Sequence, residues 1–182
     1  MDPMPVDRTH RKAMILCVAI AWAIVAFASP ALALDSEPNR QTLQGLQGFK
    51  VLIEDLGSDI ERLGLIKSEL QMDLEAKLRK AGIKVLTQEE CYKTPGEPYL
   101  YLNININTGK LGDEKYSYSI DIGVIQNVLL QRDPRMKSYS VTWSTGGVGS
   151  IEKEFVGRLR ESVDELAKIF VNAFFSVNPK KK

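Results

Sequence analysis

Strict alternation of apolar and polar residues from Tyr99 to Asn107 is the feature that most constrains how this chain can fold. Successive side chains of a strand point to opposite faces of the sheet, so the alternation predicts a strand with one buried face and one outward face. The apolar positions are Leu100, Leu102, Ile104 and Ile106. The outward positions are Tyr99, Tyr101, Asn103, Asn105 and Asn107.

The same alternation continues along the chain and predicts further strands. After a hairpin loop over 108–113, a long return strand runs from Tyr116 to about Leu130, with a bulge near Gln126. Arg132–Arg135 is predicted as the next turn, and Tyr139, Val141 and Trp143 alternate with polar residues in a last strand. The outward face would then also carry Ser117, Ser119, Asp121, Ser138, Ser140, Thr142 and Ser144.

Two segments instead show helical spacing. Ile66, Leu70, Leu74 and Leu78 recur every four residues, and Gly82 follows as a left-handed cap. The glycine run 146–149 is interpreted as the end of the sheet, with Ser150 capping a closing helix whose apolar stripe reaches Val177. A helix of that length would span about 35–40 Å.

Shorter elements complete the order. Strands are predicted at Phe49–Glu54 and Ile83–Leu86, a capping box at Ser58 and Glu61, and a loop over Gln88–Pro98. Each strand offers one apolar face and each helix one apolar stripe. The sequence therefore predicts an α+β fold: a two-layer sandwich of a mostly antiparallel sheet with two helices packed on one face.

The first 33 residues have the organisation of a secretory signal peptide. A positive leader with Arg8, Arg11 and Lys12 precedes an apolar segment of about 16 residues, and Ala31-Leu32-Ala33 forms a cleavage site. The segment is shorter than the ~20 residues of a membrane-spanning helix, which argues against a permanent anchor. We expect cleavage after Ala33, a periplasmic or secreted location and no stable membrane span. A loose lead-in (34–48), one domain (49–179) and a basic tail (180–182) would remain.

Removal of the leader restricts the chemistry of the domain. It leaves 21 basic and 21 acidic residues, so there is no basic excess of the kind that binds nucleic acid. The only histidine, His10, and one of the two cysteines, Cys17, leave with it. Ser-His-Asp, Cys-His and His-ligated zinc sites would then lack their imidazole. The sequence predicts a protein that is not an enzyme and has no metal or cofactor.

Three remaining features favour structural interpretations. The glycine run lacks a phosphate-loop or dinucleotide pattern, and Glu152 and Glu154 would repel an anion there. Cys91 is expected to be an inert, half-buried thiol in a loop, with an intermolecular disulfide as the alternative. The apolar stripe widens near the end of the closing helix, either as core or as a contact patch; its members are Phe170, Phe174, Phe175 and Val177.

Adjacent carboxylates are the other candidate for catalytic chemistry. Neighbouring side chains on a strand point in opposite directions, whereas glycoside hydrolysis needs two carboxyl groups in one cleft. We therefore interpret them as solvated charges. The pairs are Glu54-Asp55, Glu89-Glu90 and Asp113-Glu114.

The element order resembles small exported bacterial α+β domains of cell-envelope assembly factors. The likeness lies in the long strand from Tyr116 to Leu130, the strand from Tyr139 to Trp143 and the long closing helix, behind a signal peptide. Such domains occur in lipopolysaccharide-assembly lipoproteins and at the amino terminus of the Tol-system periplasmic protein. This chain departs from the lipoproteins because it has no lipoprotein cysteine. The resemblance implies a fold and an envelope setting, and it assigns no functional residue.

These observations lead to a ranked hypothesis of function. The outward face is either an ordinary solvated face or a surface that grips a glycan, a peptide or a neighbouring strand. The favoured hypothesis is a non-catalytic binding or scaffolding module that contacts an envelope protein through this face or its edge, with homo-oligomerisation also possible. The alternatives are a binder of a small apolar ligand or lipid, in a pocket between helices and sheet, and a carboxylate-dependent hydrolase.

Overall fold

A single five-stranded sheet organises the domain, in the strand order β2-β1-β3-β4-β5. The computed structural model describes residues 35–109 and 114–179. The predicted signal peptide, part of the predicted hairpin loop and the basic tail lie outside these residues. The strands are β1 (Gly48–Ile53), β2 (Lys84–Val85), β3 (Tyr99–Asn107), β4 (Lys115–Leu130) and β5 (Asp133–Glu152).

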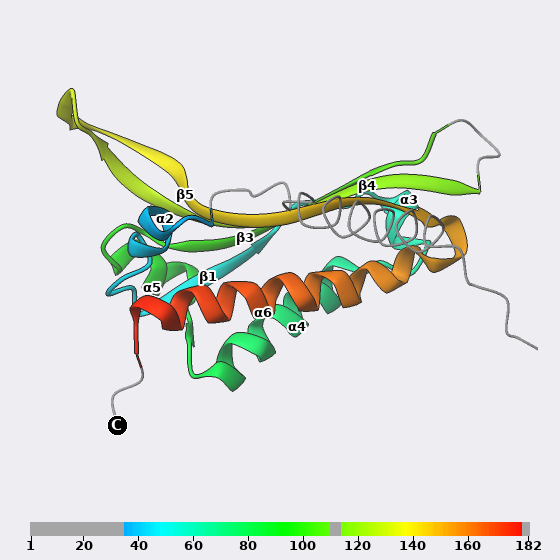
Figure 1. Cartoon of the computed structure of the whole chain (residues 1–182), viewed down its shortest axis with the longest axis horizontal. Helices are drawn as coiled ribbons and strands as arrows, with labels where there is room; N and C mark the ends of the chain where they lie inside the picture. Colours follow the sequence, from blue (N-terminus) through cyan, green and yellow to red (C-terminus); the bar gives the residue numbers. More distant parts are fainter. Residues whose placement is uncertain (1–34, 110–113, 180–182) are drawn as a thin grey trace, which may run out of the picture. The chain divides into compact units, whose positions relative to one another are not determined.

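Helices α4 (Lys67–Ala81) and α6 (Leu159–Val177) form a second layer under one face of the sheet (Figure 1). The shorter helices are α2 (Glu37–Gln41), α3 (Ser58–Glu61), α5 (Gln88–Lys93) and the 3₁₀ helix η1 (Lys153–Arg158). β1 pairs in parallel with β2 and β3, while β3–β4 and β4–β5 are antiparallel. The expected two-layer α+β fold, with both long helices on one face, is confirmed.

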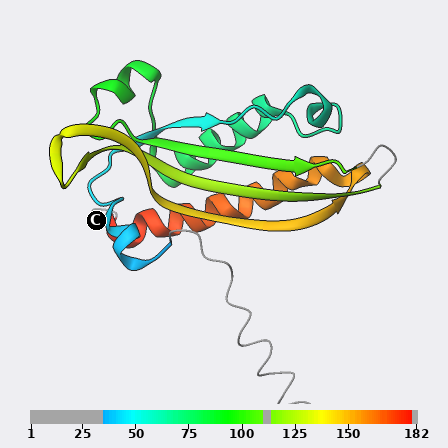
Figure 2. The same ribbon diagram turned by 90° about the horizontal axis from the view of Figure 1, so that it is seen from above.

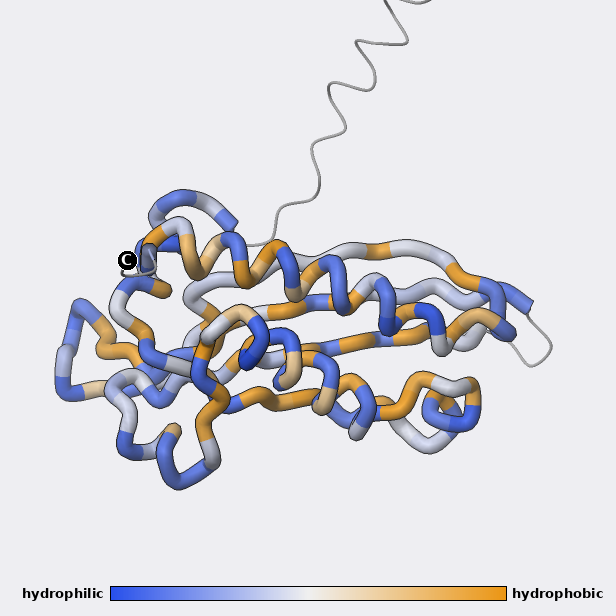
Figure 3. Tube along the Cα trace, turned by 90° about the horizontal axis from the view of Figure 1, so that it is seen from below, coloured by the Kyte–Doolittle hydropathy of each residue, from blue (hydrophilic) through white to orange (hydrophobic). Residues whose placement is uncertain are grey.

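The core lies between the helices and the inner face of the sheet. Phe170 of α6 stands at its centre, because its ring centroid is 5.2 Å from Phe49 and 5.4 Å from Trp143. Figure 3 shows hydrophobic and hydrophilic residues following one another along α4 and α6, as expected for helices with one buried side. The inner face is provided by Phe49, Val51, Ile53, Leu100, Leu102, Ile104, Ile120, Ile122, Val124 and Trp143.

Helix α4 forms where the spacing predicted it. Leu70, Leu74 and Leu78 are buried, and Gly82 ends the helix with a φ of 86°. Charged side chains fasten α4 to α6: Arg160 contacts Glu69 and Asp73, and Lys77 contacts Asp164. Within the described ranges, no helix combines the length and hydrophobicity of a membrane span.

Two segments predicted to be irregular are helical. The lead-in (34–48) contains α2, and Leu43 just beyond it is completely buried. The predicted loop after β2 contains α5, which begins at a capping box formed by Thr87 and Glu90. The capping box predicted at Ser58 and Glu61 is wrong, because α3 begins after Gly57 without a side-chain cap. Helices this short carry too little periodicity to stand out in a sequence.

Strand β5 is much longer than predicted, and this is the main correction to the fold. It includes Asp133–Arg135, which was predicted as a turn, and it continues through the glycine run to Glu152. Two of the glycines are required by cross-strand neighbours. A Cβ at Gly149 would lie 2.7 Å from the Tyr118 hydroxyl, and one at Gly146 would lie 2.5 Å from the backbone oxygen of Ile120. The closing helix therefore begins after η1 rather than at Ser150.

A bulge in β5 changes which residues face outward. Val124 pairs with Trp143 and Ile125 pairs with Val141, so Thr142 is an extra residue without a counterpart on β4. Trp143 is fully buried on the inner face, whereas Val141 and Tyr139 are 43 % and 51 % exposed. The bulge near Gln126 was thus predicted on the right hairpin but on the opposite strand.

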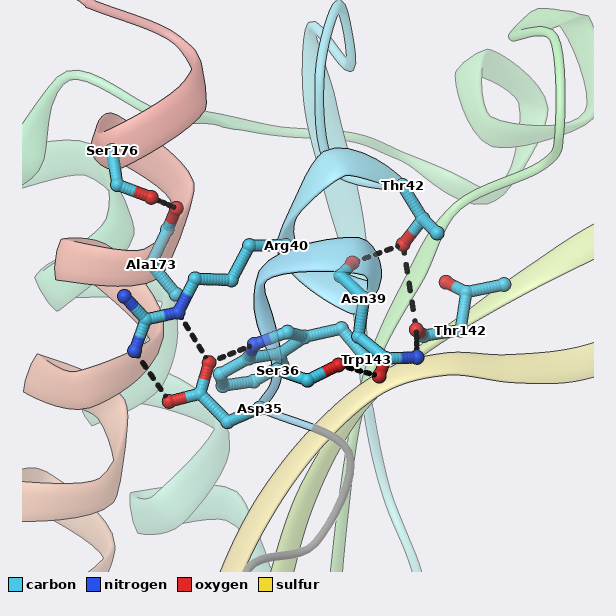
Figure 4. A network of polar contacts seen from close by, with 9 residues as sticks. All are labelled: Asp35, Ser36, Asn39, Arg40, Thr42, Thr142, Trp143, Ala173 and Ser176. Atoms are coloured by element: carbon cyan, nitrogen blue, oxygen red, sulfur yellow. Dashed lines mark hydrogen bonds and ion pairs between the residues drawn. The ribbon is translucent and has the colours of Figure 1, made fainter.

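Helix α2 sits against this bulge and is held there by polar contacts (Figure 4). Asn39 donates a hydrogen bond of 2.9 Å to the carbonyl oxygen of Thr142. The Asp35 carboxylate accepts bonds of 2.6 and 2.7 Å from Arg40 and a bond of 2.7 Å from the indole N–H of Trp143. These hydrogen bonds, led by those of Arg40, hold the pKa of Asp35 below its usual value.

Candidate interaction surface

The outer face of the sheet is the candidate functional surface. Residues of neighbouring strands lie side by side on it and form rows that cross the strands. Pairing places Asn103 beside Asp121, Asn105 beside Ser119, and Asn107 beside Ser117. Each row continues onto β5, because Asp121 pairs with Gly146 and Ser119 with Val148. All five predicted site residues lie on this face: Tyr99, Tyr101, Asn103, Asn105 and Asn107.

Within residues 35–109 and 114–179, neither long helix covers this face. Both long helices pack on the opposite side, as the view from above shows (Figure 2). Asn105 and Asn107 are exposed, while Tyr99, Tyr101 and Asn103 are half-buried between neighbouring side chains. Along β3 and the facing part of β4, hydroxyl and amide groups make up most of this surface, and each can donate or accept a hydrogen bond without carrying charge. Leu52, Val141 and Val148 add exposed apolar side chains to it.

Only part of the predicted β5 contribution is correct. Ser144 lies on the outer face beside Gly123, as predicted. Ser138, Ser140 and Thr142 do not share it, because the bulge at Thr142 reverses the alternation before Trp143. Val141 and Tyr139 occupy the outer face there instead. Sequence reasoning missed them because unbroken alternation would place both with the buried Trp143.

Two tyrosines make one end of the outer face aromatic, whereas asparagine and serine residues lie at the other end. The rings of Tyr99 and Tyr139 meet edge to face with centroids 6.2 Å apart. Gln88 donates a hydrogen bond of 2.8 Å to the Tyr99 hydroxyl. The Tyr139 hydroxyl donates to Glu97, which raises the pKa of Tyr139 to about 12. Both rings are thus held in fixed positions at the surface.

Tyr101 is fixed in a similar way at the centre of the face. Its hydroxyl donates to the carboxylate of Glu54, and this bond raises the pKa of Tyr101 to about 12. The charged side chains beside the β3 residues on this face are Glu54, Lys50, which pairs with Tyr99, and Asp121, which pairs with Asn103. Ordering of a tyrosine before a partner arrives reduces the entropy that binding must overcome.

Glu97 joins the aromatic end to a shallow pocket. It accepts a bond of 3.1 Å from Asn127 as well as the Tyr139 bond, and its pKa is lowered by both. Its φ of 43° is unusual for a residue other than glycine. The pocket has a volume of about 290 Å³, and its lining includes Tyr92, Glu97, Asn127, Leu129 and Lys137.

The space between α4 and α6 holds a cavity of only about 10 Å³, lined by Leu70, Leu74 and Val163 among others. That is room for about one water molecule and none for a lipid. A larger pocket of about 710 Å³ lies at the far end of the β4–β5 hairpin and is mostly charged; its lining is Arg62, Leu63, Glu114, Lys115, Glu152, Lys153 and Glu154.

The adjacent carboxylates are engaged separately rather than gathered in one cleft. Glu89 pairs with Lys93 at 2.5 Å, Glu90 pairs with Lys84 at 2.8 Å, and Asp55 lies 3.6 Å from Lys67. Asp113 lies outside the described residues. No group of three or more potential metal ligands occurs in the ranges 35–109 and 114–179.

Cys91 is fully buried in α5 rather than half-buried in a loop. Its thiol lies 3.7 Å from the carbonyl oxygen of Pro98, and burial raises its pKa. A buried thiol with a raised pKa is poorly placed for exchange with another molecule.

Neither the protein-family models nor the curated proteins contain a match to this chain. Among the described residues, the candidate site is a sheet face that no long helix covers, with hydrogen-bonded tyrosines at one end and amides and hydroxyls at the other.

Proposed function

We propose that this protein is an exported, non-catalytic binding or scaffolding module that contacts a partner protein of the cell envelope through the outer face of its sheet. The observation that carries the proposal is the asymmetry of the two faces. α4 and α6 cover one face, and the other presents ordered tyrosines, amides and hydroxyls with few charges.

The composition of the outer face supports a protein partner. Tyrosine is enriched at the centres of protein interfaces, where charged residues are depleted. Tyr99, Tyr101 and Tyr139 each keep a polar bond through the hydroxyl while offering ring surface to a partner. Neighbouring asparagine and serine side chains supply adaptable hydrogen bonds.

The cellular setting of the proposal comes from the sequence. The signal peptide predicted over residues 1–33 would deliver the domain to the periplasm or the outside, and the element order resembles envelope-assembly domains. With one buried thiol and no imidazole beyond His10, the mature chain would act by contact rather than by the usual nucleophilic or zinc chemistry.

Crosslinking in the native cell tests the proposal. The wild-type protein should be recovered in a defined adduct with an envelope protein, identified by mass spectrometry. Asn105→Lys, which places a charge in the middle of the outer face, should abolish that adduct. Asn172→Lys is the matched control, because Asn172 is exposed on α6 in the other layer.

Two results would contradict the proposal. One is an adduct that survives Asn105→Lys and disappears with Asn172→Lys, which would move the contact surface to the helices. The other is turnover of a substrate by the purified protein, which would make it an enzyme.

A further inference from the structure

Strand β5 forms one edge of the sheet, and no described residue protects one stretch of that edge. Among the described residues β5 pairs only with β4, so the backbone groups on its other side have no strand beside them (Figure 2). Exposed edges of this kind pair with other chains unless they carry charge, proline, a bulge or a covering segment.

Two of the three parts of β5 carry such protection. The beginning has charges and a proline at Asp133, Pro134 and Arg135. The middle has the bulge at Thr142, which α2 covers through the hydrogen bond from Asn39 to the Thr142 carbonyl. No comparable device protects the last part, Gly146–Ile151, within the residues that the structure describes.

The sequence of this last part suits close approach by another strand. The fourteen residues from Ser138 to Ile151 include no charged side chain and no proline. Three of the six residues in Gly146–Ile151 are glycines, which have no side chain that would obstruct a second strand. Val148 stands among them with 82 % of its surface exposed, more than any other large apolar residue described.

The edge is complementary to itself. In an antiparallel pair centred on Val148, the two Val148 side chains would lie next to each other on the outer face, and Gly147 would oppose Gly149 of the second copy. Farther out, Gly146 would face Ser150, and Ser144 would face Glu152. No like charges would oppose each other, and the two exposed valines would cover one another.

The opposite edge of the sheet favours a closed dimer over a chain of copies that could grow further. β2 has only two residues, one of which is the exposed Lys84, so it offers little for a β5 strand to extend. Pairing of β5 with β5 about a twofold axis uses the same edge of both copies and leaves no long edge for further growth.

We propose that two copies of this protein associate through antiparallel pairing of the Gly146–Ile151 edges of β5, forming one continuous ten-stranded sheet. The proposal goes beyond the binding function and stands apart from it: a dimer forms with or without an envelope partner, and its outer face stays open.

Sedimentation of the protein purified after export, across micromolar concentrations, tests the proposal. The wild type should behave as a dimer. Val148→Lys should raise the dissociation constant by roughly 100-fold, because two like charges would meet at the centre of the pair. Ser119→Lys is the matched control, because Ser119 pairs with Val148 on the same face but lies one strand inside the edge. It should leave the dimer intact.

A disulfide experiment reports the register directly. Val148→Cys places two thiols side by side at the centre of the pair and should give a covalent dimer on mild oxidation, while Ser119→Cys should not. The native Cys91 is buried and does not interfere. Trp143 fluorescence verifies that each variant is folded, because Trp143 is the only tryptophan outside residues 1–33.

A monomeric wild type at all these concentrations would overturn the proposal, and so would a dimer that Val148→Lys leaves unchanged. Neither result bears on the envelope partner, because these measurements use the purified protein alone and the partner experiment uses Asn105→Lys. Failure of one proposal is therefore distinguishable from failure of the other.

Discussion

The inner and outer faces of the sheet differ sharply in burial and composition. On the inner face, Phe49 and Trp143 are completely buried against Phe170. On the outer face, the alternate residues of the same strands are exposed or half-buried, and most of those on β3 and β4 are polar. The inner face therefore carries the hydrophobic core, and the outer face is the one to which we assign the proposed contact.

The largest effect of a substitution on stability is expected at the centre of the inner face. Phe170→Ala removes the ring that contacts both Phe49 and Trp143 and leaves a cavity, so the free energy of unfolding should fall by about 3–5 kcal/mol. Urea unfolding followed by Trp143 fluorescence measures it. A loss below about 1 kcal/mol would show that the two layers do not depend on this contact.

The next effect is expected where α2 meets the inner face. Asp35→Asn removes the ion pair with Arg40 and weakens the acceptor of the Trp143 indole, at a cost of about 1–3 kcal/mol. The folded pKa of Asp35 is lowered, so its stabilisation is present at neutral pH and is lost as the pH falls through that lowered value.

The pH dependence provides the control for Asp35. The stability difference between wild type and Asp35→Asn should be largest near neutral pH and should shrink as the pH falls below 3.8, the ordinary pKa of aspartate, and the wild-type carboxylate becomes protonated. A difference that stays constant over this range would mean that the charge of Asp35 contributes nothing.

Glycines of β5 allow a matched comparison within one strand. Gly146→Ala should destabilise by about 1–3 kcal/mol, because the new Cβ would lie 2.5 Å from the Ile120 carbonyl oxygen. Gly147→Ala should change stability by less than about 0.5 kcal/mol, because no atom lies within 4 Å of its Cβ position. Chemical unfolding of both variants measures the difference, and equal losses would contradict the assigned register.

The smallest effect on stability is expected on the outer face. Asn105 is exposed, so Asn105→Lys should alter the free energy of unfolding by no more than about 0.5 kcal/mol, while abolishing the partner adduct. Unfolding and crosslinking of the same variant test both statements. A large loss of stability would mean that Asn105 serves the fold rather than contact.

Much of the fold could be predicted from local patterns. The alternation from Tyr99 to Asn107 matches β3 residue for residue, and the four-residue spacing with Gly82 gives the end of α4. Both signals are periodic and require only that one side of the element be buried.

The continuation of β5 through the glycine run could not be predicted from the local sequence, for a physical reason. Glycine usually interrupts a strand, but here Tyr118 and Asp121 on β4 fill the space above Gly149 and Gly146. Only pairing between distant segments makes glycine the fitting residue at these positions.

The candidate site was predicted in part. All five predicted site residues of β3 lie on the outer face. They could be predicted because the alternation of apolar and polar residues alone determines which face of a strand each side chain occupies. The aromatic end formed by Tyr139 and Val141 was missed, because a single extra residue at Thr142 reverses the pattern. A bulge depends on how two strands pair, and the sequence of one strand alone does not show that pairing.

A photo-crosslinking scan over both layers tests the central claim, that the uncovered sheet face is the contact surface. The crosslinking amino acid is placed in turn at Asn103, Asn105 and Asn107 on the sheet and at Glu165, Lys168 and Asn172 on α6, all in cells. We expect the same partner adduct from the three sheet positions and none from the helix. Adducts from the α6 positions, with none from β3, would contradict the account.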